Sequence, residues 1–485
     1  MKKYVLFLFI AVLSTGSSIA QELNDAHIKT IKKFIESYNS QDYGNMRKNF
    51  STVLKLVLTK KRIKQLYAYQ YEMLGNAKIT NIYKRSEKSY FIDLAYDRDT
   101  TEIQKIGLSL SRKNKIIGMF NPKSKFIFNK SENPDYFDKE NALKQLDSIF
   151  ELKTAVANFN GCLVVIKDKK EFYKKCAGML EIDENHKLNE NTLFDLASCS
   201  KQFTAMAIMI LKEKGKLLYN DKVEKYFPDF PYKDIKIENL LTHTSGLPDY
   251  MPLFEKYWDK SKIATNRDVL DLLIKYKPKM NFKPGSEYEY CNTGYVVLSS
   301  IIEEVSGQPF SEFISQSIFK PLSMNNSRVY NTRYSKNEIL ENRASGHSFS
   351  TIYKKYLPVQ KMPELDYYKY LDGINGDGAV NSSINELILW DNGIRENALI
   401  KEENFRDALN PYKISNGDLS HYGYGWELQK DDKYERVIYH SGSWGGNTSF
   451  ILHFLDKDLS VIILSNNEYI NIEKFALKVA KIMNK

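Results

Sequence analysis

The hydrophobic pattern of this chain changes character near residues 129–139, and that change constrains the fold more than any other feature. Before it, residues 23–70 place apolar side chains at helical spacing, and residues 76–120 form short β-rich segments separated by charged turns. Helices followed by a meander of about four strands are typical of a small α+β domain. We therefore predict three parts after the N-terminus: a domain over 21–130, a linker over 131–140 and a larger domain over 141–485.

The first residues predict export. A positive start, Met1-Lys2-Lys3, precedes an unbroken apolar run from Tyr4 to Leu13, and small residues surround Ala20. Because the run is too short to cross a bilayer, we interpret residues 1–20 as a signal peptide cleaved after Ala20. A short N-terminal membrane anchor is the alternative. Gln21 stands where a lipoprotein requires cysteine, so we expect a periplasmic or secreted protein without a transmembrane anchor.

Composition excludes several classes of function. Hydrophobic residues make up 42 % of the 485 residues, enough for a large core. Lys and Arg number 70 against 60 acidic residues, a formal net charge of +10. Because this excess forms no long basic run, we expect no nucleic-acid partner. The sequence contains no H-E-x-x-H motif and no G-x-S-x-G motif. We expect neither a metal nor a cofactor, and we disfavour an α/β-hydrolase.

The four cysteines allow three disulfide pairings. Cys162 and Cys176 flank a predicted hairpin turn and could face each other, and an exported protein could oxidise them. Their spacings match no zinc pattern. We nevertheless slightly favour four free, buried thiols, including Cys199 and Cys291, which lie inside motifs described below.

Ser198-Cys199-Ser200-Lys201 opens an apolar helix that closes near Gly215. Residues three apart on a helix share a face, so Ser198 and Lys201 are expected to point into the same cleft. A serine hydroxyl needs an adjacent base to become a nucleophile, and a desolvated lysine can serve as one. A second copy of this motif, Ser317 to Lys320, is followed at once by Pro321, which should end its helix. We interpret Ser317 as structural.

Two further motifs follow in the chain. Tyr290-Cys291-Asn292 lies between a turn and another apolar helix, where a tyrosine can relay a proton and an asparagine amide can orient a lysine or a substrate. His440-Ser441-Gly442-Ser443-Trp444 follows a strand-like run, and its glycine permits close approach of a second backbone. We expect Ser441, Gly442, Ser443 and Trp444 to bind substrate. The N–H groups of Ser443 and Ser198 would form an oxyanion hole.

These motifs, in this order, resemble the serine β-lactamase-related family over residues 190–466. That family includes class C β-lactamases, D-alanyl-D-alanine carboxypeptidases, D-aminopeptidases and family VIII esterases. Similar blocks include residues 194–205, 239–248, 284–295, 319–324 and 375–380. The resemblance implies an α+β, β-lactamase/transpeptidase-like fold, in which helices flank an antiparallel sheet and a helical subdomain is attached. The preceding small domain resembles NTF2/SnoaL-like accessory domains found beside exported hydrolases.

The resemblance also implies a mechanism. Ser198 attacks the acyl carbon, Lys201 and Tyr290 move its proton, and water releases the acyl-enzyme. Asn292 would hold Lys201 and the substrate, and His440 would assist Tyr290 or a substrate carboxylate. Because His440 replaces the lysine of the family's K-T-G element, a permanent cation is lost, which favours peptidase or esterase activity over a β-lactamase.

We expect a small-molecule or peptide acyl substrate, with cell-wall peptide as one option. The alternative function is a non-catalytic, penicillin-binding-like module for envelope binding or signalling, since a fold alone does not fix activity. Three residues near the motifs are interpreted as structural: His243 shapes a loop by a hydrogen bond, Asp377 lies in a turn, and His421 lies in an aromatic turn.

Overall fold

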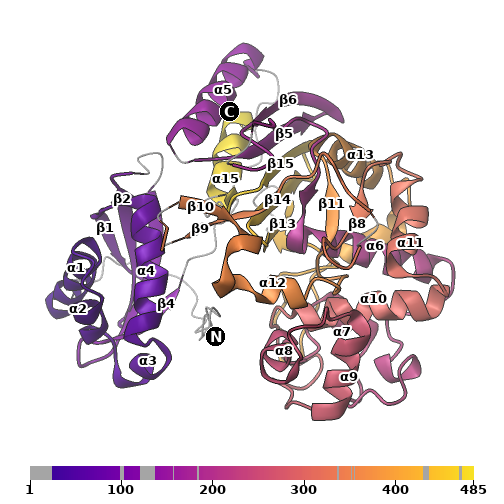
Figure 1. The fold of residues 1–485 in the computed structure, drawn as a ribbon, viewed down its shortest axis with the longest axis horizontal. Helices are drawn as coiled ribbons and strands as arrows, with labels where there is room; N and C mark the ends of the chain where they lie inside the picture. The colour runs from indigo at the N-terminus through magenta and orange to yellow at the C-terminus, as the bar shows by residue number, and fades with distance from the viewer. Residues whose placement is uncertain are drawn as a thin grey trace. The chain divides into compact units, whose positions relative to one another are not determined.

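The computed structural model describes residues 24–98, 103–120, 137–156, 158–182, 185–335, 338–350, 352–353, 355–429, 436–468 and 472–484 (Figure 1). The predicted signal peptide, 1–20, and residues 131–136 of the predicted linker lie outside these ranges. The chain forms two compact units. The described residues up to position 120 form the first unit with 151–158 and 349–356, and the others form the second.

The first unit combines short helices with one antiparallel sheet. The helices are α1 (Asp25–Asn39), α2 (Tyr43–Lys48), α3 (Thr52–Val57) and α4 (Lys60–Leu74). The strands are β1 (Ala77–Lys84), β2 (Ser89–Tyr96), β3 (Ile103–Leu110) and β4 (Ile116–Phe120), paired in the order β1-β2-β3-β4. The apolar residues of α1 and every second residue of β2 are buried together. The helices and the meander expected here are present, and the likeness to NTF2/SnoaL domains stays a prediction.

The second unit is built on a six-stranded antiparallel sheet. Its strands are β5 (Gly161–Lys167), β6 (Lys170–Ala177), β12 (Glu427–Gln429), β13 (Val437–Trp444), β14 (Asn447–Phe454) and β15 (Leu459–Ser465). Their order is β12-β13-β14-β15-β5-β6. The β5–β6 hairpin near the start of the unit therefore completes a sheet whose other strands come from its C-terminal end.

Helices cover both faces of this sheet (Figure 1). They include α5 (Lys139–Val156), α6 (Lys201–Glu213), α13 (Ile384–Arg395) and α15 (Ile472–Met483). On one face, Phe159 lies between Phe150 and Phe475, with ring centroids 5.8 and 5.3 Å away. On the other, Phe203 of α6 stacks on Trp390 of α13 at 4.2 Å. Because side chains alternate between two covered faces, every residue of β14 and β15 is buried.

A helical subdomain and short strands complete the unit. The remaining helices are α7 (Ile237–Leu241), α8 (Met251–Tyr257), α9 (Asn266–Tyr276), α10 (Asn292–Ser306), α11 (Phe310–Ile314), α12 (Tyr367–Tyr370) and α14 (Glu402–Ala408). The remaining strands of this unit are β7 (Phe194–Asp195), β8 (Arg328–Val329) and β11 (Val380–Ser382). Strands β9 (His347–Ser350) and β10 (Lys355–Pro358) pair with each other, and the end of β9 and the start of β10 fall in the range 349–356 of the first unit. Helix α10 packs against α6, α7, α9 and α11. The predicted α+β class, with helices around an antiparallel sheet, is confirmed.

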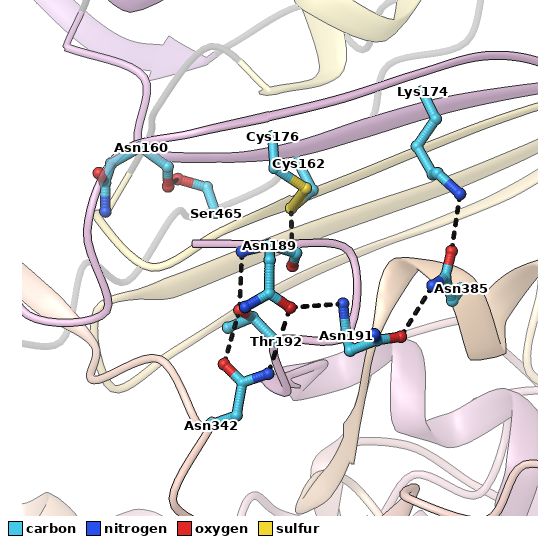
Figure 2. The surroundings of a disulfide bond; sticks show 10 residues. All are labelled: Asn160, Cys162, Lys174, Cys176, Asn189, Asn191, Thr192, Asn342, Asn385 and Ser465. Atoms are coloured by element: carbon cyan, nitrogen blue, oxygen red, sulfur yellow. Dashed lines mark hydrogen bonds between the residues drawn. A yellow bond between two sulfur atoms is a disulfide. The ribbon is translucent and has the colours of Figure 1, made fainter. Parts of the chain in front are cut away.

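The structure corrects two expectations. The predicted linker extended to residue 140, whereas α5 begins at Lys139, so the last two linker residues are helical. The preference for four free thiols is wrong for two cysteines: Cys162 and Cys176 form a disulfide (Figure 2). They lie directly opposite each other on β5 and β6, which brings the two sulfur atoms together. Cys199 and Cys291 are free and buried, and burial raises the pKa of each thiol to about 12.

Within the described part of the chain, no helix is both long and apolar enough to cross a membrane.

We expect the Cys162–Cys176 disulfide to make a measurable contribution to the free energy of unfolding. Its cysteines are 14 residues apart in the chain, and closing a loop of about 15 residues stabilises a protein by up to about 3 kcal/mol in the chain-entropy model. We expect Cys162→Ser/Cys176→Ser to lower the free energy of unfolding by up to that amount, measured by urea denaturation. Reductant should lower the midpoint of the wild type and leave that of the double variant unchanged. Equal midpoints for oxidised and reduced wild type would contradict this expectation.

Candidate active site

The segment that carries Ser198 is fixed before its helix begins. A one-turn 3-10 helix, η1 (Ala197–Ser200), leads into α6, and Ala197 has φ = +47°, a left-handed conformation that costs energy in a non-glycine residue. Asp195 Oδ1 accepts a hydrogen bond from the Ala197 N–H at 2.8 Å, and Leu196 O accepts one from Ser449 Oγ at 2.6 Å. These bonds from two directions hold the strained turn that presents Ser198, which is partly exposed.

A polar network also holds the loop that precedes this segment (Figure 2). The Asn189 N–H donates to Thr192 Oγ1 at 3.0 Å, and Thr192 donates to Asn342 Oδ1 at 2.9 Å. Asn385, on α13, donates to Asn191 Oδ1 and accepts from Lys174 of β6, each at 2.8 Å. The loop between the disulfide hairpin and η1 is thereby bonded to the sheet and to α13.

Lys201 is fully buried and points at the Ser198 hydroxyl. Its Nζ lies 3.2 Å from Ser198 Oγ and 2.7 Å from the main-chain oxygen of Asp377. Desolvation disfavours the ammonium form and lowers the pKa of Lys201 to about 8, although the nearby Asp377 and Asp249 carboxyls oppose this shift. A neutral amine within hydrogen-bonding distance of a hydroxyl is able to accept its proton.

Tyr290 lies on the loop before α10 and faces the same pair. Lys201 Nζ is 5.1 Å from the centroid of its ring, and its phenol interacts with the Ser198 side chain. The residue keeps 38 % of its surface exposed, so its ring borders solvent. Burial of the phenol end raises the pKa of Tyr290 well above 10, although the Ser198 hydroxyl opposes the shift. Tyr290 is therefore a neutral phenol that can pass a proton on.

Strand β13 runs directly beside the nucleophile segment. A methyl group built at Gly442 would overlap Leu196 O and Ser449 Oγ and would stand 3.0 Å from Ser198 N. The Cys199 thiol donates to the main-chain oxygen of His440 at 3.2 Å. These contacts bring residues 440–443 to Ser198, so Ser198, Lys201, Tyr290 and this strand form one cluster.

The outer edge of β13 is open beside the cluster. Strand β12 pairs with β13 only up to Tyr439, and among the described strands none continues the pairing along 440–444. Ser441 and Ser443 are exposed there, whereas Gly442 is turned inward. Trp444 packs edge-on against Tyr368, with ring centroids 4.6 Å apart, and is half-buried. An extended chain could pair with this edge.

His440 and Asn292 lie at the cluster, with partners other than those expected. His440 Nδ1 lies 2.7 Å from Ser441 O, which only accepts, so Nδ1 carries the proton. Nε2 forms a hydrogen bond with the Tyr422 hydroxyl at 2.7 Å. Asn292, at the start of α10, interacts through its side chain with Asp249. Both nitrogens of His440 are engaged, and the bonds that hold Lys201 Nζ come from Ser198 and Asp377.

Sequence reasoning missed Tyr422, Asp377 and Asp249. Tyr422 follows His421 in the aromatic turn that was interpreted as structural, and it supplies the partner of His440. Asp377 was interpreted as a turn residue, yet its main chain holds Lys201 and its carboxyl accepts from Tyr250 at 3.1 Å. The signal that could have found it is the position of Gly-Asp-Gly inside a family-like block. No motif or spacing in the sequence marked Asp249 as part of the site.

His243 has the structural bond predicted for it. Its Nδ1 accepts the N–H of Cys291 at 3.1 Å, and its ring lies 4.2 Å from that of Tyr290. Burial holds its pKa well below 6.5, so the ring is neutral.

Two other serines are poor candidates for a nucleophile. Ser317, of the second S-x-x-K copy, lies in a π-helical turn, Ser315–Phe319, that ends just before Pro321. Ser460 bonds Asp391 Oδ1 at 2.5 Å and His453 Nδ1 at 2.8 Å, which resembles a catalytic triad, but all three side chains are inaccessible. Within the described residues, no group of three or more His, Cys, Asp or Glu side chains is arranged to hold a metal ion.

Known proteins place this fold and cluster in a family. The Beta-lactamase family model matches residues 152–478, so the chain belongs to that family of serine acyl-transferring hydrolases. The resemblance to the serine β-lactamase-related family is thereby confirmed. Penicillin-binding protein 4* of Bacillus subtilis (strain 168) is 40 % identical over 330 residues, which cover 68 % of this chain and 73 % of that protein.

Two further relatives agree with this assignment. Protein flp of Staphylococcus aureus is 26 % identical over 341 residues, 67 % of this chain, and the chain spans only 64 % of that protein's length. The solved structure of the octameric penicillin-binding protein homologue from Pyrococcus abyssi superposes with a TM-score of 0.60 at 27 % identity. It covers 70 % of this chain and 76 % of that one. The chain is thus a serine-hydrolase-like relative of penicillin-binding proteins.

The close approach at Gly442 predicts a sharp steric effect. Gly442→Ala should push β13 away from Ser198 N and displace the two N–H groups that we expect to bind an oxyanion, with a loss of about a hundredfold in turnover of nitrophenyl acetate. The matched control is Gly378→Ala, because a methyl there meets only Ala197 O, at 3.9 Å. Both variants should give wild-type far-ultraviolet circular dichroism. Wild-type turnover in Gly442→Ala would show that activity does not depend on the close approach of β13 to Ser198 N.

Proposed function

We propose that this protein is an exported serine hydrolase that works through an acyl-enzyme on Ser198. The observation that carries the proposal is the 3.2 Å hydrogen bond between the buried Lys201 amine and the Ser198 hydroxyl, beside Tyr290 and the open edge of β13. A nucleophile, a base and a phenol in mutual contact are the parts that acyl transfer requires.

Acylation begins when Ser198 Oγ attacks the acyl carbon and its proton moves to Lys201 Nζ. With a pKa of about 8, Lys201 is about half neutral at pH 8, so a base is available without an external one. The proton then passes through the Tyr290 phenol to the leaving group. We expect the N–H groups of Ser198 and Ser443 to stabilise the oxyanion, because β13 approaches Ser198 N closely at Gly442, next to Ser443.

Deacylation reverses these roles. Water attacks the acyl carbon of the Ser198 ester, and Tyr290, the partly exposed member of the cluster, relays its proton. Lys201 returns the proton to Ser198 Oγ. No glutamate is assigned to this step.

The charges around Ser198 favour peptide, amide or ester substrates. His440 stands where a lysine would be a permanent cation, and an imidazole offers no permanent charge to the carboxylate of a β-lactam. Asp249 and Asp377 add negative charge close to Lys201. The open edge along 440–444 suits an extended acyl chain that pairs with the strand, and Trp444 borders that edge.

The nucleophile is tested by intact-mass detection of an acyl adduct, with a fluorophosphonate and a penicillin in parallel. We expect the fluorophosphonate to add one equivalent to the wild type and none to Ser198→Ala. Ser317→Ala is the matched control, because it removes the serine of the second S-x-x-K copy, and it should react like the wild type. An adduct on Ser198→Ala would place the nucleophile elsewhere. No adduct on the wild type with either reagent would favour the non-catalytic module.

Export is tested separately. The positive start, the apolar run and the small residues before Gln21 support cleavage after Ala20. We expect N-terminal sequencing of protein recovered from the periplasm or medium to begin at Gln21. Protein that retains Met1 and stays with the membrane fraction would support the anchor alternative.

A further inference from the structure

The buried amine of Lys201 needs a counter-charge whenever it holds a proton. The side chain has no exposed surface, and a buried ammonium without a partner is costly. Its Nζ has three N–H donors when protonated, and two acceptors contact it: Ser198 Oγ at 3.2 Å and Asp377 O at 2.7 Å. Neither acceptor carries a negative charge. The charge that stabilises the ammonium must therefore come from side chains around these contacts.

Asp377 is held in place by its own loop. Gly376, with φ = +92°, packs so closely on α10 that a methyl there would stand 2.5 Å from Ser299 Oγ and 2.6 Å from Tyr295 O. The Gly376 carbonyl accepts from Thr204 Oγ1 of α6 at 2.7 Å. The Asp377 carboxyl accepts from the Tyr250 hydroxyl at 3.1 Å. The close packing on α10 and the bond to α6 thus fix the loop that holds the main-chain oxygen of Asp377 against Lys201.

A second carboxyl, that of Asp249, acts on Lys201 through its charge and belongs to another segment. Asp249 Oδ1 accepts the N–H of Met251 at 2.9 Å, and its carboxyl interacts with the Asn292 amide. Asn292 thereby acts on the lysine through Asp249, in place of the direct contact predicted from the motif.

The other ionisable groups around Lys201 do not supply this charge. Its titratable neighbours are Asp377, Asp249, Cys199, Cys291, Tyr290, Tyr295, His243 and His440. Burial raises the pKa of each thiol to about 12, and it also raises the pKa values of Tyr290 and Tyr295, so these four are neutral near pH 8. Burial holds the pKa of His243 well below 6.5, and neither His243 nor His440 can supply a negative charge, because an imidazole is neutral or cationic. Among these neighbours the carboxyl groups are those of Asp377 and Asp249, and Asp377, whose pKa burial raises to about 6, is ionised near pH 8.

We propose that Asp377 is a positioning residue whose carboxylate is the counter-ion for Lys201, with Asp249 as the second carboxylate of the pair. When Ser198 attacks, its O–H bond breaks, an N–H bond forms on Nζ, and the bond between Oγ and the acyl carbon forms. The ammonium is then stabilised until Tyr290 delivers the proton to the leaving group. This inference rests on the proposed function.

The negative charge of Asp377 predicts in which direction the pH dependence of activity moves when that charge is removed. The Asp377 carboxylate raises the pKa of Lys201, whereas burial lowers it to about 8, and catalysis needs the neutral amine. Activity of the wild type should therefore rise with pH toward about 8. Asp377→Asn removes one negative charge, lowers the pKa of Lys201 further and moves the acidic limb of kcat/KM to lower pH, by about one pH unit.

The experiment measures kcat/KM for nitrophenyl acetate between pH 5.5 and 10, in roughly half-unit steps about the pKa of Lys201. Asp372→Asn is the matched control: its carboxyl lies on the same loop, burial raises its pKa to about 6, and it accepts main-chain N–H groups of Arg333 and Tyr334. Its acidic limb should coincide with that of the wild type. Tyr250→Phe removes the hydrogen bond to the Asp377 carboxyl but leaves its negative charge in place. It should therefore shift the acidic limb of kcat/KM less than Asp377→Asn does.

An acidic limb at the wild-type position in Asp377→Asn would overturn the proposal, as would an equal shift in Asp372→Asn. If Asp377→Asn does not fold, Asp249→Asn tests the same pair, and an unshifted limb there would overturn the role of the pair. Failure of the proposed function looks different, because wild-type protein would then form no fluorophosphonate adduct at Ser198. If wild-type protein forms the fluorophosphonate adduct at Ser198 but the acidic limb of Asp377→Asn is unshifted, only the counter-ion role is rejected and the proposed function stands.

Discussion

The contact between β13 and the 3-10 turn at Ser198 is the constraint on which the catalytic arrangement depends. It joins segments 241 residues apart by a thiol hydrogen bond from Cys199 to His440, and it leaves no room for a side chain at Gly442. On one side of this contact lies the open edge of the sheet, and on the other lie Lys201 and α6. The strained backbone at Ala197 persists because these neighbours over-determine it.

Much of this arrangement could be predicted from the sequence, because its parts are local patterns. The helix after Ser198, the turn before Tyr290 and the glycine on the strand each have a short-range signature, and their order in the chain carried the family assignment. The β5–β6 hairpin was also visible, since apolar runs flank a charged turn. The class of fold followed from these patterns, and the family match confirms it.

Other features escaped because they depend on which groups meet in three dimensions. Asp249 precedes a short helix and Asp377 lies in a glycine-rich loop, and only the folded chain brings both to Lys201. Spacing likewise could not show that the Tyr422 hydroxyl holds His440 or that Asn292 faces Asp249. The disulfide was one of the pairings considered, and deciding it required the register that sets Cys162 opposite Cys176. Motifs thus pointed to the proposed reacting groups, whereas the carboxyl groups that act on Lys201 belong to segments without a motif.

The order of strands in the large sheet has a consequence for when the protein becomes active. Four of its strands, β12 to β15, come from the C-terminal end of the chain, and β15 pairs with β5 from the start of the unit. During synthesis, Ser198 and Lys201 leave the ribosome long before the strand that completes their surroundings. Pairing across such sequence distances is slow, because the loop must close before the contacts form. A nascent or truncated chain therefore holds the proposed nucleophile without the Ser443 N–H, and the proposed hydrolysis waits for the last strands.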